Sequence, residues 1–436
     1  MNDNLKKLLG EEYKERFSPK EFVPGESFIP VSGKTFDEKE ILNMTEAVLD
    51  GWWTEGRFSD LFEKRLSEWL GVKFTAIVNS GSSANLVAFS ALMSAKLKDR
   101  RLKPGDEVIS VAAGFPTTVN PIVQNGLVPV FVDVDLGTYN INIEKLKKAI
   151  GPKTRAIFLA HTLGNPCELD KIAELCEEHG LWFVEDNCDA LGSVYDGKKT
   201  GTFGHVATCS FYPAHHITMG EGGAVFTDDA LLYRIIKSIR DWGRDCWCRT
   251  GMDDTCKRRF SWKLGNLPLG YDHKYIYSEM GYNLKVTDIQ AALGVAQLDK
   301  LEDFIQKRRD NFDYLYEKLK KHEDYFILPS WSDKAESSWF GFLLTVKDDA
   351  GFTRDDLIKH LNEKKIGTRL LFAGNVIKQP YFVEKNIKYR IVDNLVNTDL
   401  VMTNTFWIGV HPGLSKDMLN YIVNEFNEFI KNMNKT

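Results

Sequence analysis

Residues 210–223 read Ser-Phe-Tyr-Pro-Ala-His-His-Ile-Thr-Met-Gly-Glu-Gly-Gly. The segment begins at the end of one apolar run, Val206–Phe211, and leads into a second, Gly223–Thr227, and we interpret both runs as β-strands. Between them stand two adjacent histidines, His215 and His216. Because an imidazole can take up and release a proton near neutral pH, this loop is a candidate catalytic segment.

Further apolar runs precede this segment, and helical patterns separate them. The candidate strands are Phe74–Asn79, Glu107–Val111, Val128–Val132, Arg155–Ala160 and Leu181–Glu185, and the candidate helices include Ser83–Lys96 and Ile143–Ile150. Strands that alternate with helices predict an α/β fold with a mostly parallel sheet. Ligands bind such sheets at the carboxyl ends of the strands, so we expect the chemistry near residues 80, 115, 162, 186 and 212.

The chain is long enough for two unequal domains. We expect an N-terminal arm over residues 1–45, a large domain over 46–300, and a linking helix with a small α+β domain over 301–436. The linking helix belongs to a long helical run, roughly 287–321. Residues 241–282, the Cys-rich insertion, are aromatic, charged and rich in Cys and Gly. An irregular stretch of this length usually carries function.

Composition excludes several classes of partner. The 436 residues are 43% hydrophobic, and 56 Lys and Arg against 61 Asp and Glu give a net charge of −5. This balance provides no basic field for a nucleic acid. No apolar run resembles a signal peptide or reaches the roughly 18 residues of a membrane span. We therefore expect a soluble, cytoplasmic protein.

Seven cysteines form an odd set in a chain expected to be intracellular, so a disulfide framework is not predicted. Three of them lie among apolar or helical neighbours and are interpreted as buried thiols: Cys167, Cys176 and Cys209. Gaps of 57, 1 and 7 residues separate the other four, Cys188, Cys246, Cys248 and Cys256. Four thiolates suit a small iron–sulfur cluster or a structural zinc ion. Free thiols are the third alternative.

The stretch Asn79-Ser80-Gly81-Ser82-Ser83-Ala84-Asn85 follows a predicted strand and opens a predicted helix. A glycine lets the backbone approach an anion, and the start of a helix presents unpaired N–H groups. The segment is therefore a candidate phosphate site, and a capped turn without a ligand is the alternative.

Asp186 ends the apolar strand that precedes it. A carboxylate at a strand end could pair with a protonated pyridine nitrogen and keep the ring able to accept electrons. The alternative is an ordinary helix cap or a surface acid, so Asp186 gains weight only together with the other elements.

These elements together resemble the DegT/DnrJ/EryC1/StrS sugar aminotransferase-like family of fold-type I PLP enzymes. In that family Ser-Phe-x-Pro-x-Lys precedes a Gly-Glu-Gly-Gly turn, and the lysine forms the internal aldimine. The resemblance runs over nearly the whole chain and includes Gly81–Ala84, Phe115, Ala160–Gly164, Glu185-Asp186 and Gly281–Lys285. It implies an aspartate aminotransferase-like large domain, which binds the cofactor, and a small α+β C-terminal domain.

The resemblance also implies residue roles. Ser82, Ser83 and Ser210, with the Gly81 turn, would bind the cofactor phosphate. Asp186 would pair with the pyridine nitrogen, and Phe115 would stack on the ring. Asn283 would reach the phosphate of the neighbouring subunit, which implies an obligate homodimer. Asp189 stands where the family has a glutamine that contacts the cofactor, so the chain departs from the pattern there.

The family's lysine position is His215 in this chain. An imidazole cannot form an imine, so the cofactor would bind noncovalently, as pyridoxamine 5'-phosphate (PMP), and His215 would move protons. With a 4-keto sugar, removal of a proton from the cofactor methylene would expel the C3 hydroxyl. The alternatives are an inactive enzyme with an ordinary histidine at 215, or a base at His216, which we expect only to pack or hydrogen-bond.

The four cysteines resemble those of the CDP-4-keto-6-deoxyglucose 3-dehydrase subfamily, which holds a [2Fe–2S] cluster. This resemblance implies that Cys188, Cys246, Cys248 and Cys256 bind the cluster, which would pass two electrons singly after dehydration. The sequence has no Gly-x-Gly-x-x-Gly nucleotide fingerprint. The subfamily uses a separate NADH-dependent flavin/iron–sulfur reductase, and we expect such a partner.

Two segments are candidates for the substrate side. Trp53 lies in Gly51–Arg57, which matches the family's substrate loop, although a packed aromatic turn is an equal alternative. Arg369 lies in Gly367–Asn375, which borders the family's sugar pocket. Its guanidinium could pair with a diphosphate or take part in an ordinary ion pair.

The predicted function is PMP- and [2Fe–2S]-dependent C3 dehydration of CDP-4-keto-6-deoxy-D-glucose on the route to 3,6-dideoxyhexoses of bacterial surface polysaccharides. One alternative is a 3-dehydrase for another nucleotide-linked 4-keto-6-deoxy sugar. A sugar aminotransferase would require a lysine at position 215. A noncatalytic metal or redox protein on the same fold would not need Asp186, Ser210 and the glycine turn together.

Overall fold

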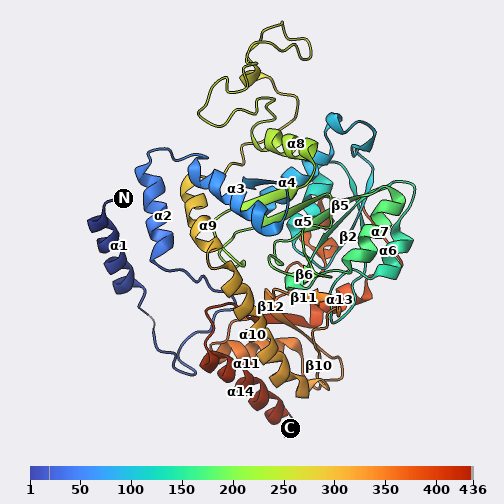
Figure 1. The fold of residues 1–436 in the computed structure, drawn as a ribbon. Helices are drawn as coiled ribbons and strands as arrows, with labels where there is room; N and C mark the ends of the chain where they lie inside the picture. Colours follow the sequence, from blue (N-terminus) through green and yellow to red (C-terminus); the bar gives the residue numbers. More distant parts are fainter. Residues whose placement is uncertain (19, 434–436) are drawn as a thin grey trace.

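The computed structural model of the chain describes residues 1–18 and 20–433. Its centre is an eight-stranded sheet (Figure 1), whose strands follow in the order β1 (Phe74–Val78), β9 (Gly223–Thr227), β8 (Val206–Ser210), β5 (Trp182–Asp186), β4 (Thr154–Ala160), β2 (Glu107–Val111), β3 (Val128–Val132) and β14 (Arg390–Ile391). All neighbours from β8 to β14 are parallel, and β9 is antiparallel to both of its neighbours. The prediction of an α/β fold with a mostly parallel sheet is confirmed.

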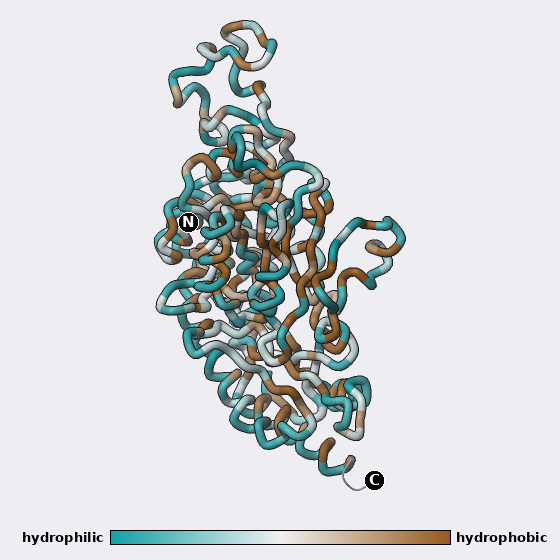
Figure 2. Tube along the Cα trace, turned by 90° about the vertical axis from the view of Figure 1, so that its right-hand side faces the viewer, coloured by the Kyte–Doolittle hydropathy of each residue, from teal (hydrophilic) through white to brown (hydrophobic). Residues whose placement is uncertain are grey.

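Helices cover both faces of this sheet, as they must when strands are apolar on both sides. One face packs against α4 (Gly81–Leu92), α5 (Pro116–Gln124) and α8 (Ala230–Arg240). The other packs against α3 (Arg57–Leu70), α6 (Ile143–Ala149), α7 (Leu169–His179) and α9 (Asp288–Leu298). The hydrophobic residues accordingly run through the interior along the strands (Figure 2).

A second sheet forms the core of the C-terminal part. Its antiparallel strands are β10 (Phe326–Ile327), β12 (Gly341–Val346), β15 (Thr405–Gly409) and β13 (Arg369–Leu370). They pack with α10 (Leu301–Leu319), α11 (Arg354–Glu363) and α14 (Lys416–Met433), and α13 (Val396–Asn404) lies beside β12 and β15. A third sheet has the order β11 (Ala335–Glu336), β6 (Val194–Tyr195) and β7 (Lys198–Lys199).

The remaining helices are α1 (Asp3–Arg16), α2 (Glu38–Leu49), the short α12 (Pro380–Glu384), and 3-10 turns at Ala95–Arg100, Thr162–Gly164, His273–Tyr275, Lys320–His322 and Val376–Lys378. The helical run expected over 287–321 consists of two helices, α9 and α10. Lys300, at the junction, forms ion pairs with Asp37 and Glu40 of the N-terminal arm. The junction therefore ties the arm to the body.

The edge of the large sheet contains a strand from the C-terminal part of the chain. β14 pairs with β3, and its first residue, Arg390, lies 2.7 Å from the carboxylate of Glu107 on β2. The backbone N–H groups of Asn397 and Thr398 donate to Asp133, which follows β3. The C-terminal part of the chain, as far as the structure describes it, is thus fastened to the central sheet as well as to its own sheet.

The Cys-rich insertion projects from the body beyond α8 (Figure 1). It is irregular apart from the turn at His273–Tyr275, as expected from its composition. In the described part of the chain, no helix is both long and apolar enough to cross a membrane.

Candidate active site

A cavity of about 990 Å³ opens at the carboxyl ends of the parallel strands. Its walls come from the loops after β1, β2, β4, β5 and β8 and from the C-terminal part of the chain. Nine predicted site residues line it: Gly81, Ser82, Phe115, Asp186, Cys188, Asp189, Ser210, His215 and Arg369. The cavity therefore lies where the strand order predicts a ligand site.

The start of α4 forms one end of the cavity. Ser80 caps the helix by accepting a hydrogen bond from Ser83 N, and the two hydroxyls lie 3.0 Å apart. Ser82 instead faces the cavity, where its hydroxyl donates to Thr117 at 3.2 Å. A Cβ on Gly81 would lie 2.3 Å from Ser210 Cβ, so only glycine permits this approach. Ser83 is engaged in the cap and is absent from the cavity wall.

Asp186 lies at the end of β5 and is almost fully buried. Its Oδ2 accepts hydrogen bonds from Asn85 Nδ2 at 2.9 Å and Thr118 Oγ1 at 2.7 Å. Its Oδ1 accepts from Cys188 N at 3.2 Å. Because three donors fix the carboxylate, it is oriented before any ligand arrives.

His215 pairs with Asp189: its Nε2 lies 3.4 Å from Asp189 Oδ1. Burial raises the pKa of Asp189, and the neighbouring His215 opposes this effect. The imidazole packs against the ring of Phe340, with the centroids 5.3 Å apart. A carboxylate that orients a histidine is a common arrangement for proton transfer.

Arg308, on α10, holds this loop from behind. Its guanidinium donates to the carbonyls of His215 at 3.3 Å and Trp339 at 3.2 Å. Burial lowers the pKa of Arg308 to about 9. His216 is buried and shares a 2.8 Å hydrogen bond with Ser338 O. Burial and the charge of Arg308 hold the pKa of His216 well below its usual value, which suits the expected packing role.

The substrate-side candidates are placed differently. Phe115 is about half exposed at the rim of the cavity, and Arg369 also lines it, with Nη1 donating to Thr368 O. Trp53 is exposed, donates to Val48 O, and is not part of the cavity wall. Asn283 is also exposed and outside this wall, and it accepts a hydrogen bond from Lys285 Nζ.

The four candidate cysteine ligands fall into two groups. Cys188 lies in the cavity wall beside Asp186. In the insertion, the ligand atoms of Cys246, Cys248 and His273 lie within 4.8 Å of one another, and Cys256 Sγ lies 3.6 Å from His273 Nε2. The structure therefore gathers three of the four thiols and adds a histidine that the sequence analysis did not select.

The thiols of the insertion differ in acidity. Burial raises the pKa of Cys248, but hydrogen bonds from Thr255 and the neighbouring cysteines lower it to about 6. Burial and the nearby Cys248 raise the pKa of Cys246 to about 11. A thiol that ionises readily beside further sulfur and nitrogen donors is a suitable starting point for metal binding.

The sequence profile of the DegT/DnrJ/EryC1/StrS aminotransferase family matches residues 34–427. The chain belongs to this family. It is 55% identical over 429 residues to the lipopolysaccharide biosynthesis protein RfbH of Salmonella typhimurium, covering 98% of both chains. It is 51% identical over 428 residues to the dTDP-4-dehydro-2,6-dideoxy-D-glucose 3-dehydratase of Saccharopolyspora spinosa, covering 98% of this chain and 92% of that relative.

Solved structures of the DegT/DnrJ/EryC1/StrS family and its relatives share the fold. The E. coli GDP-4-keto-6-deoxy-D-mannose-3-dehydratase with bound hydrated PLP superposes with a TM-score of 0.81 at 33% identity, over 92% of this chain and 99% of that one. The family and the fold class predicted from the sequence are both confirmed.

The sequence did not indicate the roles of four residues at these sites: Asn85, Thr118, His273 and Arg308. Asn85 belongs to the segment quoted as a phosphate site, and it faces Asp186 one helical turn after Gly81. The partnership of Asp189 with His215 was also missed, because residue spacing gives no signal for a contact between two different strand ends.

Proposed function

We propose that this chain is a PMP-dependent nucleotide-sugar 3-dehydratase. The observation that carries the proposal is that His215, at the position that matches the family's Schiff-base lysine, is paired with Asp189. In the described part of the chain, no lysine lines the cavity. A chain without that amine cannot hold the cofactor as an imine, so it is not suited to complete transamination.

The residues present fit such a cofactor. Asp186, already oriented by three donors, would pair with the pyridine nitrogen, and Phe115 at the rim would cover the ring. Ser82, Ser210 and the backbone at Gly81 would bind the phosphate at the start of α4. Asn283, exposed and outside the cavity of its own chain, would reach the phosphate of a second subunit in a homodimer.

Bound PMP supplies an amine that condenses with a 4-keto sugar and a ring that accepts electrons. His215 would take a proton at the cofactor methylene and return one to the departing C3 hydroxyl. Asp189 would orient the imidazole and stabilise its charged form.

For the substrate, we propose CDP-4-keto-6-deoxy-D-glucose, in the biosynthesis of 3,6-dideoxyhexoses for the O-antigen. The 55% identity to RfbH, a lipopolysaccharide biosynthesis protein, supports this pathway. Another nucleotide is the second candidate, because a 51% identical relative is named for a dTDP sugar. Arg369 at the rim would bind the diphosphate in either case.

We further propose a [2Fe–2S] cluster on Cys188, Cys246, Cys248 and Cys256. The grouping of three thiols in the insertion supports a thiolate-bound metal centre. A cluster held by these residues would supply single electrons at the cavity wall, where Cys188 lies. An NADH-dependent flavin/iron–sulfur reductase would supply them.

The test is product analysis with purified protein, PMP and a reductase. CDP-, dTDP- and GDP-4-keto-6-deoxy sugars are incubated separately, and the products are identified by mass. Loss of the C3 oxygen from the CDP sugar is the expected result. Loss from the dTDP sugar alone would transfer the proposal to the second candidate, and an amino sugar as the normal product would overturn it.

A further inference from the structure

The proposed cluster ligands lie in separate parts of the chain. Cys188 is in the cavity wall, whereas Cys246, Cys248 and Cys256 gather with His273 in the insertion. Within the described part of the chain, no residue of the insertion lines the cavity. A four-cysteine site within one subunit would therefore require the insertion to move toward its own cavity.

The base of the insertion opposes such a movement. Its two ends run antiparallel, with bridges between Asp241 and Asn283 and between Arg244 and Tyr277. At Gly243 an added Cβ would lie 1.9 Å from Glu279 O, so the two ends are in close contact. This packing sets the direction in which the insertion leaves the body.

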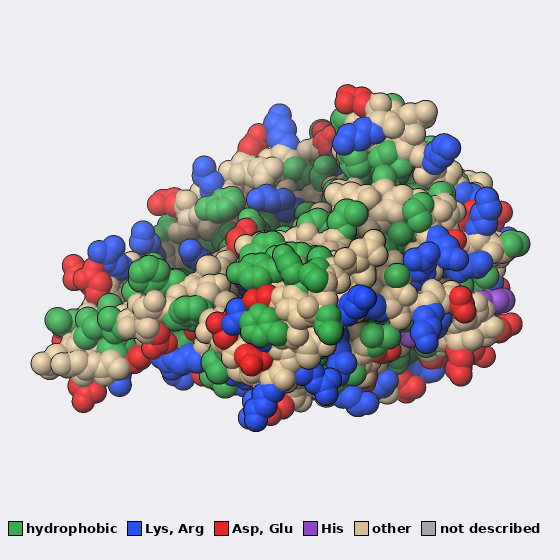
Figure 3. All heavy atoms as spheres, turned by 90° about the horizontal axis from the view of Figure 1, so that it is seen from above, with side chains coloured by type: hydrophobic (Ala, Val, Ile, Leu, Met, Phe, Trp, Pro, Cys, Tyr) green, Lys and Arg blue, Asp and Glu red, His purple; other side chains and the backbone are tan. Residues whose placement is uncertain are grey.

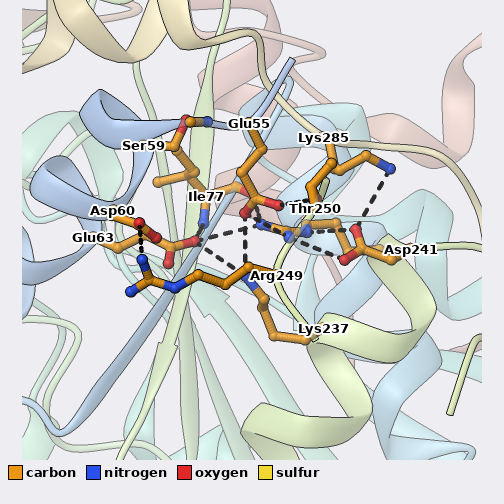
Figure 4. Close-up of polar contacts among 12 residues, drawn as sticks. Glu55, Ser59, Asp60, Glu63, Ile77, Lys237, Asp241, Arg249, Thr250 and Lys285 are labelled. Carbon is orange, nitrogen blue, oxygen red and sulfur yellow. Dashed lines mark hydrogen bonds and ion pairs between the residues drawn. The ribbon is translucent and has the colours of Figure 1, made fainter. Parts of the chain in front are cut away.

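An ion-pair network fixes the same base to the body, and Figure 4 shows Glu55, Glu63, Lys237 and Asp241 within it. Arg240, fully buried, lies 2.7 Å from Glu55, 3.4 Å from Glu63 and 2.8 Å from Asp241. Lys237 lies 3.1 Å from Glu55 and 3.7 Å from Glu63. Breaking a buried pair leaves a charge without compensation, so this network is costly to open.

The insertion itself is also tied to this network. Thr250 Oγ1 donates to Glu55 Oε2 at 3.1 Å, and Arg249 lies 2.8 Å from Asp60 on α3. Residues 249 and 250 lie between Cys248 and Cys256. The cysteine group is therefore held on the outer side of the molecule, away from the cavity of its own chain.

The outward position leaves large hydrophobic side chains uncovered. Seen from the end where the insertion projects, hydrophobic side chains gather on the surface among charged ones (Figure 3). In the insertion, Trp247, Phe260, Leu269 and Met280 are among the exposed ones, with 57–94% of their surface accessible. The rim of the cavity is a second uncovered apolar surface, with Phe115, Tyr212 and Leu370 about half exposed. Apolar surfaces of this kind mark sites of association.

We propose that the cluster is shared between two copies of this chain: Cys246, Cys248 and Cys256 of one subunit combine with Cys188 of the partner subunit. The inference rests on the iron–sulfur cluster proposed above. A two-fold arrangement would let each insertion cover the cavity rim of the other copy and complete two equal sites. The same arrangement would place the shared cluster at the cavity wall, where Cys188 lies.

A second copy is the occupant that the geometry favours, because it provides both things that the insertion lacks. It supplies a fourth thiol in an accessible wall, and it supplies an apolar rim to cover the exposed aromatic residues. His273, the fourth donor near the three thiols, then becomes a neighbour of the cluster and not one of its ligands.

Complementation between two defective variants tests this arrangement. Cys188→Ser and Cys248→Ser chains carrying different affinity tags are co-expressed, and the mixed dimer is purified and reconstituted anaerobically with ferrous iron and sulfide. With shared ligands, one of its two sites has all four cysteines, so iron content and iron–sulfur absorption reach about half of the wild-type values. With ligands from a single chain, both sites are defective and neither signal returns.

A matched control is the mixed dimer of Cys246→Ser and Cys248→Ser, whose defects both lie in the insertion. It should bind no cluster, and a cluster there would overturn the proposal. PMP binding by each variant checks that it is folded. Wild-type protein with a cluster, together with an empty Cys188→Ser/Cys248→Ser dimer, would overturn ligand sharing alone. Wild-type protein that forms no cluster would contradict the proposed iron–sulfur function itself.

Discussion

The cofactor cavity and the Cys-rich insertion organise their functional groups in opposite ways. In the cavity, Asp186 has three donors, from α4, α5 and the loop after β5, and His215 has Asp189. In the insertion, three thiols and His273 gather on an irregular segment with exposed aromatic residues around them. The large sheet and its helices position the groups of the first site, whereas the thiols of the insertion depend on an anchored base and on the surface that covers them.

If the two regions act separately, a change in the insertion should leave the cavity intact. Cys248→Ser is expected to abolish iron–sulfur absorption and reductive turnover, because serine is a poor substitute for a thiolate ligand, while PMP affinity stays at the wild-type value. Iron analysis and a PMP absorbance titration measure both effects. Cys176→Ala, which removes a buried thiol in α7, is the control and should keep its iron. A loss of PMP affinity in Cys248→Ser would show that the regions are coupled.

The converse change lies in the cavity. His215→Asn is expected to lower dehydration by about 10³-fold, because proton transfer at this position is removed. PMP binding and iron content should remain. Turnover is followed by release of the C3 oxygen, and Asp189→Asn should give a smaller decrease in the same assay. Full activity in His215→Asn would assign the proton transfer to another residue.

The contribution of the ion pairs at the base of the insertion to stability can be tested by its dependence on pH. Arg240 and Lys237 outweigh the effect of burial and lower the pKa of Glu55 to about 2. Because this pKa is lower in the folded state, the Glu55 carboxylate stabilises the fold at pH values above its unfolded pKa of 4.5. The stabilisation is lost as the pH falls from 4.5 toward 2. Glu55→Gln should therefore lower the free energy of unfolding by about 3 kcal/mol at neutral pH.

This difference from wild type should narrow steadily below pH 4.5. Urea unfolding at matched protein concentration measures it. Glu68→Gln is the control, because Glu68 forms only an exposed pair with Lys64 on α3, and its effect should stay below about 1 kcal/mol. A Glu55→Gln difference that does not change with pH would mean that the charge of Glu55 is not what anchors the base.

The smallest expected effect is on PMP affinity, and it distinguishes two neighbouring serines at the start of α4. Ser82 faces the cavity, whereas the hydroxyl of Ser83 is engaged with Ser80. Ser82→Ala should weaken PMP binding by about tenfold, since one hydrogen bond to a charged phosphate is lost. Ser83→Ala should change it by no more than about twofold by the same reasoning. Equal losses in fluorescence titrations would support the phosphate role that the sequence predicts for Ser83.

Much of the large sheet was predictable because its strands are continuous apolar runs. Glu107–Val111, Val128–Val132 and Gly223–Thr227 have the bounds expected from the sequence. Such strands can be recognised from the local sequence alone, because both of their faces are buried and nearly all of their residues are apolar. The break between α9 and α10 was not predicted, because Asp299 and Lys300 do not interrupt a helical pattern.

The contacts that define the sites were less predictable. The pairing of His215 with Asp189 joins two loops, and His273 approaches Cys246 across the fold of an irregular segment. Neither contact follows a local period, so only the assembled structure places them. Strand β14 has two residues and no apolar alternation, and its place in the large sheet was also missed.

The position of β14 has a consequence for how the chain reaches its final form during synthesis. Strand β3 remains an open edge until residues 390 and 391 have been made, long after the rest of the parallel sheet is available. At about 5–20 residues per second, this edge stays open for tens of seconds on the ribosome. Shortening the chain before β14 should therefore yield aggregates and not a separately folded N-terminal product.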